Sequence, residues 1–391
     1  MQIGDTVFAK RGRREIVGYG VVSSAYRYEP QRKSYIHVRS VDWKKRGQWV
    51  PRDKPLVTKT LTDIGQYPGL VADIRDALHT GDVGEETQKP VETEVVVARP
   101  VYTIEDAAED MFLQRLEIEE ALELLRYKKN LVIQGPPGVG KTFFAKRLAY
   151  LLLGEKDPER ISMVQFHQSY SYEDFVQGYR PTESGKFARV DGPFLRFCDQ
   201  ALQDANLPYV LIIDEINRGN LSKIFGELLM LMEADKRSDT WATSLIYSRD
   251  GEPPFSIPKN LHVIGTMNTA DRSLALVDYA LRRRFVFIDL GPGFGQPSFA
   301  RKLSSLGVDA TLRDRVVKRL ERLNDRIRQD PNLGGGFCIG HSYFCGVGAS
   351  AADDSWYKRI VRTEIGPLLR EYWFDNTERA ADELAQLLDD D

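Results

Sequence analysis

The sequence has few cysteines and no long apolar run. Its 391 residues include only Cys198, Cys338 and Cys345, and no two of these cysteines have the close spacing of a zinc or redox site. We therefore expect reduced thiols in a cytoplasmic protein. No stretch approaches the roughly 18 uninterrupted apolar residues of a membrane span. The first residues contain no apolar signal core, so secretion and membrane insertion are both disfavoured.

An excess of charge of one sign is also missing. The chain has 54 Lys and Arg against 57 Asp and Glu, a formal net charge of −3, so any contact with nucleic acid must come from a local basic patch. Hydrophobic residues make up 42% of the chain, which is enough for sizeable cores. The length predicts two or three domains, and there is no internal repeat.

Composition and hydrophobic pattern divide the chain into four parts. Residues 1–81 contain short β-branched and aromatic runs between Gly and Pro breaks, which predicts a small barrel or sandwich. Residues 82–101 carry clustered acids and are expected to be a linker. Residues 102–290 alternate apolar strands with helices, which predicts an α/β unit with a parallel sheet flanked by helices. Residues 291–391 are helical, and we expect a small helical lid.

A glycine-rich motif stands between an apolar strand and an amphipathic helix. The segment "GPPGVGKT" fits G-x-x-x-x-G-K-[ST], in which backbone N–H groups and a helix N-terminus surround a phosphate. Lys141 should reach the β- and γ-phosphate oxygens, and Thr142 should bind Mg²⁺. The nucleotide-binding residues are therefore predicted to be Gly135, Pro136, Pro137, Gly138, Val139, Gly140, Lys141 and Thr142.

Two further strands end in polar residues. The strand "YVLIID" ends at Asp214, which we assign to the metal, and Glu215 follows as the candidate general base. The strand "HVIGTMN" ends at Asn268, whose amide could contact the γ-phosphate or the attacking water. Asp271 follows as a candidate helix cap. The strand that ends at Asn268 is expected to lie beside the other two.

Three consecutive arginines, Arg282 to Arg284, precede the last strand. Arginine can neutralise the charge of a transferring phosphoryl group and can come from a neighbouring subunit. The alternative is a solvated basic helix end.

Taken together, these motifs resemble an AAA+ ATPase module. The segments "GPPGVGKTFFAKRLAYLL", "DEINRGNLSKIFGELLMLME", "MNTADRSLALVDYALRRRF" and "GHSYF" closely resemble the McrB-type motors of modification-dependent restriction systems. The resemblance covers about Ile104 to Asp375, and "MNTADRS" is its most discriminating motif.

This resemblance implies a GTPase that uses Mg²⁺, prefers GTP to ATP, forms a hexameric ring and works with an McrC-like nuclease subunit. Asn268 and Asp271 match the family's signature pair. Arg218, Arg283 and Arg284 match candidate charge stabilisers at the ring interface. Two other functions stay open, namely a MoxR-like ATPase that remodels protein complexes and a scaffold that binds modified nucleic acid.

The first 80 residues resemble part of an EVE/PUA-like domain, a barrel family that reads modified bases in DNA with an aromatic cage. The chain begins where such domains are already part-way through, so either a truncated or a reduced barrel is expected. The alternative is that the aromatics form the barrel core. The candidate stacking residues are Tyr19, Tyr26, Tyr28, Tyr35, Trp43 and Trp49, and the candidate phosphate contacts are Lys10, Arg11, Arg13, Arg14, Lys44, Lys45 and Arg46.

Three smaller features each have two interpretations. His167, after a strand, and His341, in "GHSYF", could approach the nucleotide or could be structural. The segment "RPTESGKFARVDGP" is expected to form a hairpin around Gly185, either projecting into a ring pore or lying on the surface.

Overall fold

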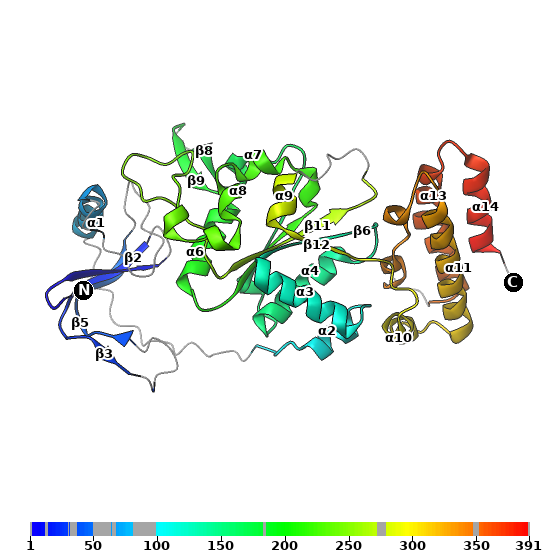
Figure 1. Ribbon diagram of the computed structural model, residues 1–391, viewed down its shortest axis with the longest axis horizontal. Coiled ribbons are helices and arrows are strands. Elements are labelled where there is room, and N and C mark those ends of the chain that lie inside the picture. The colour runs from blue at the N-terminus through cyan, green and yellow to red at the C-terminus, as the bar shows by residue number, and fades with distance from the viewer. Residues whose placement is uncertain are drawn as a thin grey trace.

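The computed structural model of the protein describes residues 2–11, 15–29, 31, 37–49, 64, 68–80, 99–182, 185–271, 279–346 and 352–389. A small N-terminal sheet, a large central sheet and a group of C-terminal helices follow one another along the long axis, and the two termini lie at opposite ends (Figure 1). No helix in the described ranges is long and apolar enough to cross a membrane.

The N-terminal part is a three-stranded antiparallel sheet covered by one helix. Strands β1 (Thr6–Arg11), β2 (Glu15–Val22) and β5 (Val41–Trp49) pair in that order. The short strands β3 (Arg27–Tyr28) and β4 (His37–Val38) pair separately. Helix α1 (Pro68–Thr80) lies in the part that was expected to be β-rich, and its buried Leu70, Ile74 and Leu78 recur once per turn on one face of the helix.

The central sheet has five parallel strands in the order β12-β6-β11-β10-β7. The three inner strands, β6, β11 and β10, are buried on both faces, as is usual in parallel sheets. Along β6, for example, Val132 packs on one face while Leu131 and Ile133 pack on the other. The bounds are β6 (Asn130–Gly135), β7 (Ile161–Gln165), β10 (Tyr209–Asp214), β11 (Leu261–Asn268) and β12 (Val286–Asp289).

Helices cover both faces of this sheet. One face packs against α2 (Ile104–Asp110), α3 (Arg115–Lys128) and α4 (Lys141–Leu153). The other packs against α6 (Pro193–Gln203), α7 (Leu221–Phe225) and α8 (Leu228–Leu231), with α5 (Tyr172–Phe175) beside them. The α/β architecture predicted from the sequence is confirmed.

The central unit begins with two short helices. Thr103 caps α2 in a capping box with Asp106. Helix α2 ends at Asp110, and Gln114 is the N-cap of α3, where its N–H donates to Glu117 Oε2 at 2.7 Å. The predicted linker lies outside the described residues up to position 98.

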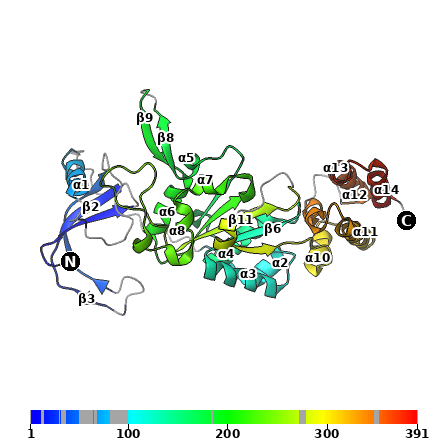
Figure 2. The ribbon, with the colours of Figure 1, turned by 45° about the horizontal axis from the view of Figure 1, so that its top comes forward.

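A two-stranded hairpin projects from the central unit. Strands β8 (Gln177–Pro181) and β9 (Phe187–Asp191) pair around a turn that contains Gly185, and they stand away from the body in Figure 2. The predicted hairpin is therefore confirmed. Further along the chain, residues 241–260 contain an isolated antiparallel bridge between Thr243 and Phe255.

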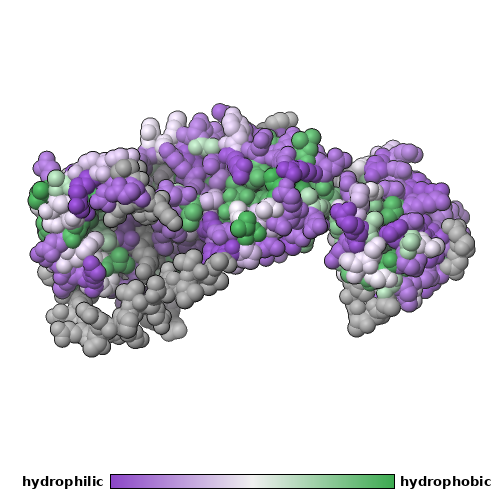
Figure 3. Space-filling model, turned by 90° about the horizontal axis from the view of Figure 1, so that it is seen from below, coloured by the Kyte–Doolittle hydropathy of each residue, from purple (hydrophilic) through white to green (hydrophobic). Residues whose placement is uncertain are grey.

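The C-terminal part contains helices and no strand among its described residues. Helix α9 (Tyr279–Arg284) precedes β12, and α10 (Pro297–Ser305), α11 (Ala310–Gln329), α12 (Asp354–Ile360), α13 (Gly366–Tyr372) and α14 (Thr377–Leu388) follow it. The last five share a separate hydrophobic core. Their surface is largely hydrophilic, whereas the central unit shows more hydrophobic area on the same face (Figure 3). We call the part of the chain from α10 to α14 the lid.

Candidate nucleotide-binding site

The phosphate loop joins the buried strand β6 to α4. Gly138 and Gly140 have φ values of +75° and +79°, a conformation that side chains with a Cβ rarely adopt. Gly135 is required for another reason, because a Cβ there would overlap the carbonyl oxygen of Leu290. The loop thus has the shape that its sequence predicts, and α4 begins at Lys141.

Lys141 is the cation of the loop. Its side chain is buried, and Nζ donates to the carbonyl oxygens of Gly135 at 3.0 Å and Pro136 at 2.8 Å. Burial lowers the pKa of Lys141 to about 8, against the opposing effect of Glu215 and Asp214. A phosphate would supply the negative charge that this buried ammonium lacks.

Asp214 lies at the same edge of the sheet as the loop. Strand β11 lies between β6 and β10, so all three strands end together at this edge. Asp214 Oδ1 accepts hydrogen bonds from Thr142 Oγ1 at 2.9 Å and from Thr266 Oγ1 at 2.5 Å. Neighbouring oxygen ligands of an octahedral Mg²⁺ are about 3 Å apart, so Thr142 and Asp214 fit such an ion.

Glu215 and Asn268 face each other beside this corner. Asn268 Nδ2 donates to Glu215 Oε1 at 2.5 Å. Glu215 has φ 53° and ψ 47°, a left-handed conformation that is uncommon for a residue with a Cβ. Burial raises the pKa of Glu215, while Arg218 opposes the shift. Arg218 bridges Glu215 at 3.3 Å and Asp271 at 3.2 Å. Five residues predicted from separate motifs, Asp214, Glu215, Arg218, Asn268 and Asp271, are therefore brought together.

Arg283 and Arg284 lie at the other end of the sheet. They end α9 just before β12 begins, and the Arg284 carbonyl accepts from Asn130 Nδ2, at the start of β6, at 3.1 Å. The Arg284 side chain pairs with Glu233 at 3.3 Å, whereas Arg283 is exposed. Neither arginine can reach the phosphate loop of its own chain.

The two candidate histidines, His167 and His341, have different surroundings. His341 is buried, and its Nδ1 accepts the Gly293 N–H at 2.8 Å, among the rings of Phe112, Phe294 and Phe299. Burial lowers its pKa to about 4, so the ring is neutral. His167 is exposed and packs edge-on against Tyr170. These contacts favour the structural interpretation of His341.

The candidate base-stacking aromatics are divided by the fold. Tyr19 and Trp49 pack against the core under α1, which favours the structural interpretation for both. Tyr26, Tyr28 and Trp43 are exposed by 51%, 56% and 36%. Among the candidate phosphate contacts, Lys44 pairs with Asp42, Lys45 donates to the Leu78 carbonyl, and Arg46 is exposed. Tyr35, Arg13 and Arg14 lie outside the described residues.

Sequence reasoning missed Thr266, and it singled out "GHSYF" in the lid for the side chain of His341 and not for its backbone. Thr266 donates to Asp214 and accepts from the Glu215 N–H at 3.3 Å, so one hydroxyl holds both acids. The lid residues Gly340 and Ser342 donate backbone hydrogen bonds to Pro137 and Gly138 of the phosphate loop. Thr266 sits two residues before Asn268 and could have been found from the strand register. The motif "GHSYF" marks the lid segment, but nothing in it identifies the phosphate loop as its partner.

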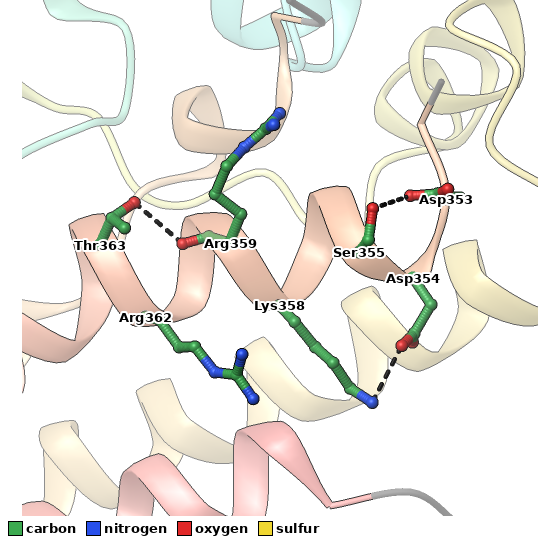
Figure 4. A pocket seen from close by; sticks show the side chains of 7 residues that line it. All are labelled: Asp353, Asp354, Ser355, Lys358, Arg359, Arg362 and Thr363. Atoms are coloured by element: carbon green, nitrogen blue, oxygen red, sulfur yellow. Dashed lines mark hydrogen bonds and ion pairs between the residues drawn. The ribbon is translucent and has the colours of Figure 1, made fainter. Parts of the chain in front are cut away.

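A surface hollow of about 610 Å³ on the lid is separate from this site. It is lined by residues of α12 and the π-helical turn Val361–Ile365 (Figure 4). Lys358 pairs with Asp354 there, and Ser355 with Asp353, so much of its charge is already matched.

Comparison with known families agrees with this geometry. Residues 130–285 match the AAA domain (dynein-related subfamily), and residues 315–381 match the alpha-helical lid domain of McrB. Residues 1–65 match a Domain of unknown function (DUF8426), which leaves their resemblance to EVE/PUA-like domains a hypothesis.

Similar proteins include two restriction enzyme components. The chain is 54% identical over 278 residues to the "Type IV methyl-directed restriction enzyme EcoKMcrB subunit" of Escherichia coli (strain K12), covering 70% of this chain and 60% of that protein. It is 27% identical over 193 residues to the "Type II restriction enzyme BsuMI component YdiS" of Bacillus subtilis (strain 168), covering 41% and 56%. A solved structure of a putative ATPase from Cytophaga hutchinsonii has a TM-score of 0.34 at 15% identity, covering 57% of this chain and 67% of that chain.

The five-stranded parallel sheet, the phosphate loop and the acids beside it define an AAA+ P-loop nucleotide-binding module. Its lid matches the alpha-helical lid domain of McrB, and the module is similar in sequence to the Escherichia coli McrB subunit. The chain spans about 60% of the length of that relative.

Proposed function

We propose that the protein is a nucleoside triphosphatase that works as a ring motor. The observation that carries the proposal is the joint position of Lys141, Thr142, Asp214, Glu215 and Asn268 at one edge of the sheet. Lys141 and the loop would hold the phosphates, and Thr142 with Asp214 would hold Mg²⁺. The bound ion would neutralise phosphate charge.

In this mechanism the Glu215 carboxylate takes a proton from the water that attacks the γ-phosphorus. Asn268 keeps the carboxylate in place, because its amide already donates to Oε1. Burial raises the pKa of Glu215, which makes the carboxylate a better proton acceptor. Arg218 and Asp271 would limit its movement through their ion pairs.

The nucleotide and the partners are proposed from the similarity to known proteins. We infer GTP as the preferred nucleotide, a hexameric homo-oligomer, and an McrC-like nuclease subunit that cuts modified DNA in the cytoplasm. The 54% identity to a methyl-directed restriction subunit supports this assignment. The N-terminal sheet would then contact DNA, with the exposed Tyr26, Tyr28 and Trp43 as the stacking candidates.

Steady-state hydrolysis of GTP and ATP by the purified protein tests which nucleotide is preferred. We expect a several-fold higher kcat/KM for GTP. A preference for ATP would favour the remodelling ATPase instead.

Glu215→Gln tests the mechanism, because glutamine keeps the shape and hydrogen-bonding reach but is not basic. Nucleotide binding and ring formation should persist, while turnover falls by about 10² or more. If the protein is a restriction motor, the Glu215→Gln ring should still recruit the nuclease but should not support cleavage of methylated DNA. Cleavage at the wild-type rate would show that hydrolysis does not drive cutting.

A further inference from the structure

Carbonyl groups of the phosphate loop accept hydrogen bonds from Lys141 and from the lid. Lys141 Nζ donates to the carbonyls of Gly135 and Pro136. The next two carbonyls accept from the lid, since Gly340 N–H donates to Pro137 at 3.2 Å and Ser342 N–H donates to Gly138 at 2.8 Å. Four successive carbonyls of the loop therefore have donors.

The lid segment that makes these bonds is itself fixed. Asn324 of α11 is buried, and its side chain bonds both the N–H and the carbonyl of Ile339, at 2.6 and 3.0 Å. Gly340 follows directly. A Cβ on Gly340 would overlap the carbonyl carbon and oxygen of Gly138. The φ of Gly340 is −77°, so this glycine is needed for room rather than for its backbone conformation.

The orientation of a trans peptide links these carbonyls to the phosphate. In each peptide plane the C=O and the next N–H point in opposite directions. A lid bond to the Pro137 carbonyl therefore turns the Gly138 N–H the other way, and a bond to the Gly138 carbonyl does the same for the Val139 N–H. Pro136 and Pro137 have no N–H, so Gly138 and Val139 carry the first donors of the loop.

We propose that the lid segment Gly340–Ser342 is a positioning element of the nucleotide site, which holds the Gly138 and Val139 N–H groups toward the β-phosphate. Gly340 and Ser342 act through the loop and do not touch the nucleotide themselves. The inference rests on the proposed nucleotide binding and adds that a contact from the lid sets phosphate affinity.

Gly340→Ala tests the contact, with Gly335→Ala as the matched control. Gly335 lies in the same lid segment, and a Cβ there would meet nothing within 4 Å. Fluorescent GDP and GMP are titrated against the full chain of each variant, after its melting temperature has been compared with that of the wild type. We expect Gly340→Ala to lose about tenfold or more in affinity for GDP, because bonds to a charged phosphate are lost. GMP affinity should change by less than about twofold, since GMP has no β-phosphate.

Asn324→Ala provides a second test if Gly340→Ala does not fold. It releases the lid segment and adds no atom near the loop, so it should show the same selective loss for GDP. Wild-type GDP affinity in the folded variant, or an equal loss for GDP and GMP, would overturn the proposal. Failure of the wild type to bind GDP, or equal GDP binding by Lys141→Ala, would instead overturn the proposed nucleotide function.

Discussion

Arg283 lies at the far end of the central sheet from the phosphate loop, so it can stabilise a phosphoryl group only on a neighbouring subunit. Strand β6 separates the two ends with six residues, and the Arg284 carbonyl is bonded to the first of them. At about 3.3 Å per residue the separation is about 20 Å. Arg283 is exposed and makes no ion pair within the described residues, whereas Arg284 is held by Glu233.

We therefore predict that Arg283→Ala binds nucleotide normally and loses about 10³-fold in turnover, as expected for removal of an arginine supplied in trans. Lys141→Ala should be inactive for a different reason, because it cannot hold the phosphates. Each variant retains the group that the other lacks.

Mixing the two inactive variants gives a quantitative test. In a head-to-tail ring assembled from equal amounts, about a quarter of the interfaces combine an intact Lys141 with an intact Arg283 from the next subunit. Hydrolysis should recover to about a quarter of the wild-type rate, and ring formation can be followed by mass photometry. Arg282→Ala is the control, since Arg282 lies over the Phe287 ring at 5.7 Å and should be dispensable. Absence of recovery from properly mixed rings would refute the trans assignment.

Three further predictions concern single residues. Because burial lowers the pKa of Lys141 to about 8 and a bound phosphate favours the ammonium, nucleotide binding must take up a proton above that pH. The affinity should fall by up to about tenfold per pH unit above pH 8, and a Kd that is constant there would contradict this. Thr266→Val removes the hydroxyl that bonds Asp214 and Glu215, and should lower the free energy of unfolding by about 1–2 kcal/mol and reduce kcat. Urea unfolding and turnover measure the two effects, and unchanged values would show that the hydroxyl is dispensable. For His341, burial lowers the pKa from 6.5 to about 4, so the unfolded chain binds the proton more readily. Stability present above pH 6.5 is then lost as the pH falls toward 4, by up to about 3 kcal/mol from this group, and His341→Gln should reduce that slope in urea titrations at several pH values.

The sequence predicted the central unit well because its signals are local. Buried strands, the glycine-rich turn and the polar residues that end β10 and β11 are each written in a few consecutive residues. Asn268 was expected near the attacking water, and the carboxyl ends of parallel strands meet at the same edge, which places it beside Glu215. The structure contains this contact.

Other features depend on contacts between distant segments. The hydrogen bonds from Gly340 and Ser342 join the lid to a phosphate loop that is far away in the sequence. No pattern around Gly340 identifies that loop as its partner. The pairing of Arg284 with Glu233 separates it from Arg283, although the two adjacent arginines look equivalent in the sequence. Tyr19 and Trp49 pack toward α1, a helix that the sequence analysis did not expect.

The left-handed backbone of Glu215 has a consequence for protein engineering. A residue with a Cβ in this conformation costs about 1 kcal/mol relative to glycine or asparagine. Burial of its carboxylate adds to that cost, as its raised pKa indicates. Selection for thermostability alone would therefore favour Asn or Gly at this position, and the most heat-resistant variants recovered would be inactive. The residue is an instance of a trade-off between stability and activity that is set by a single backbone angle.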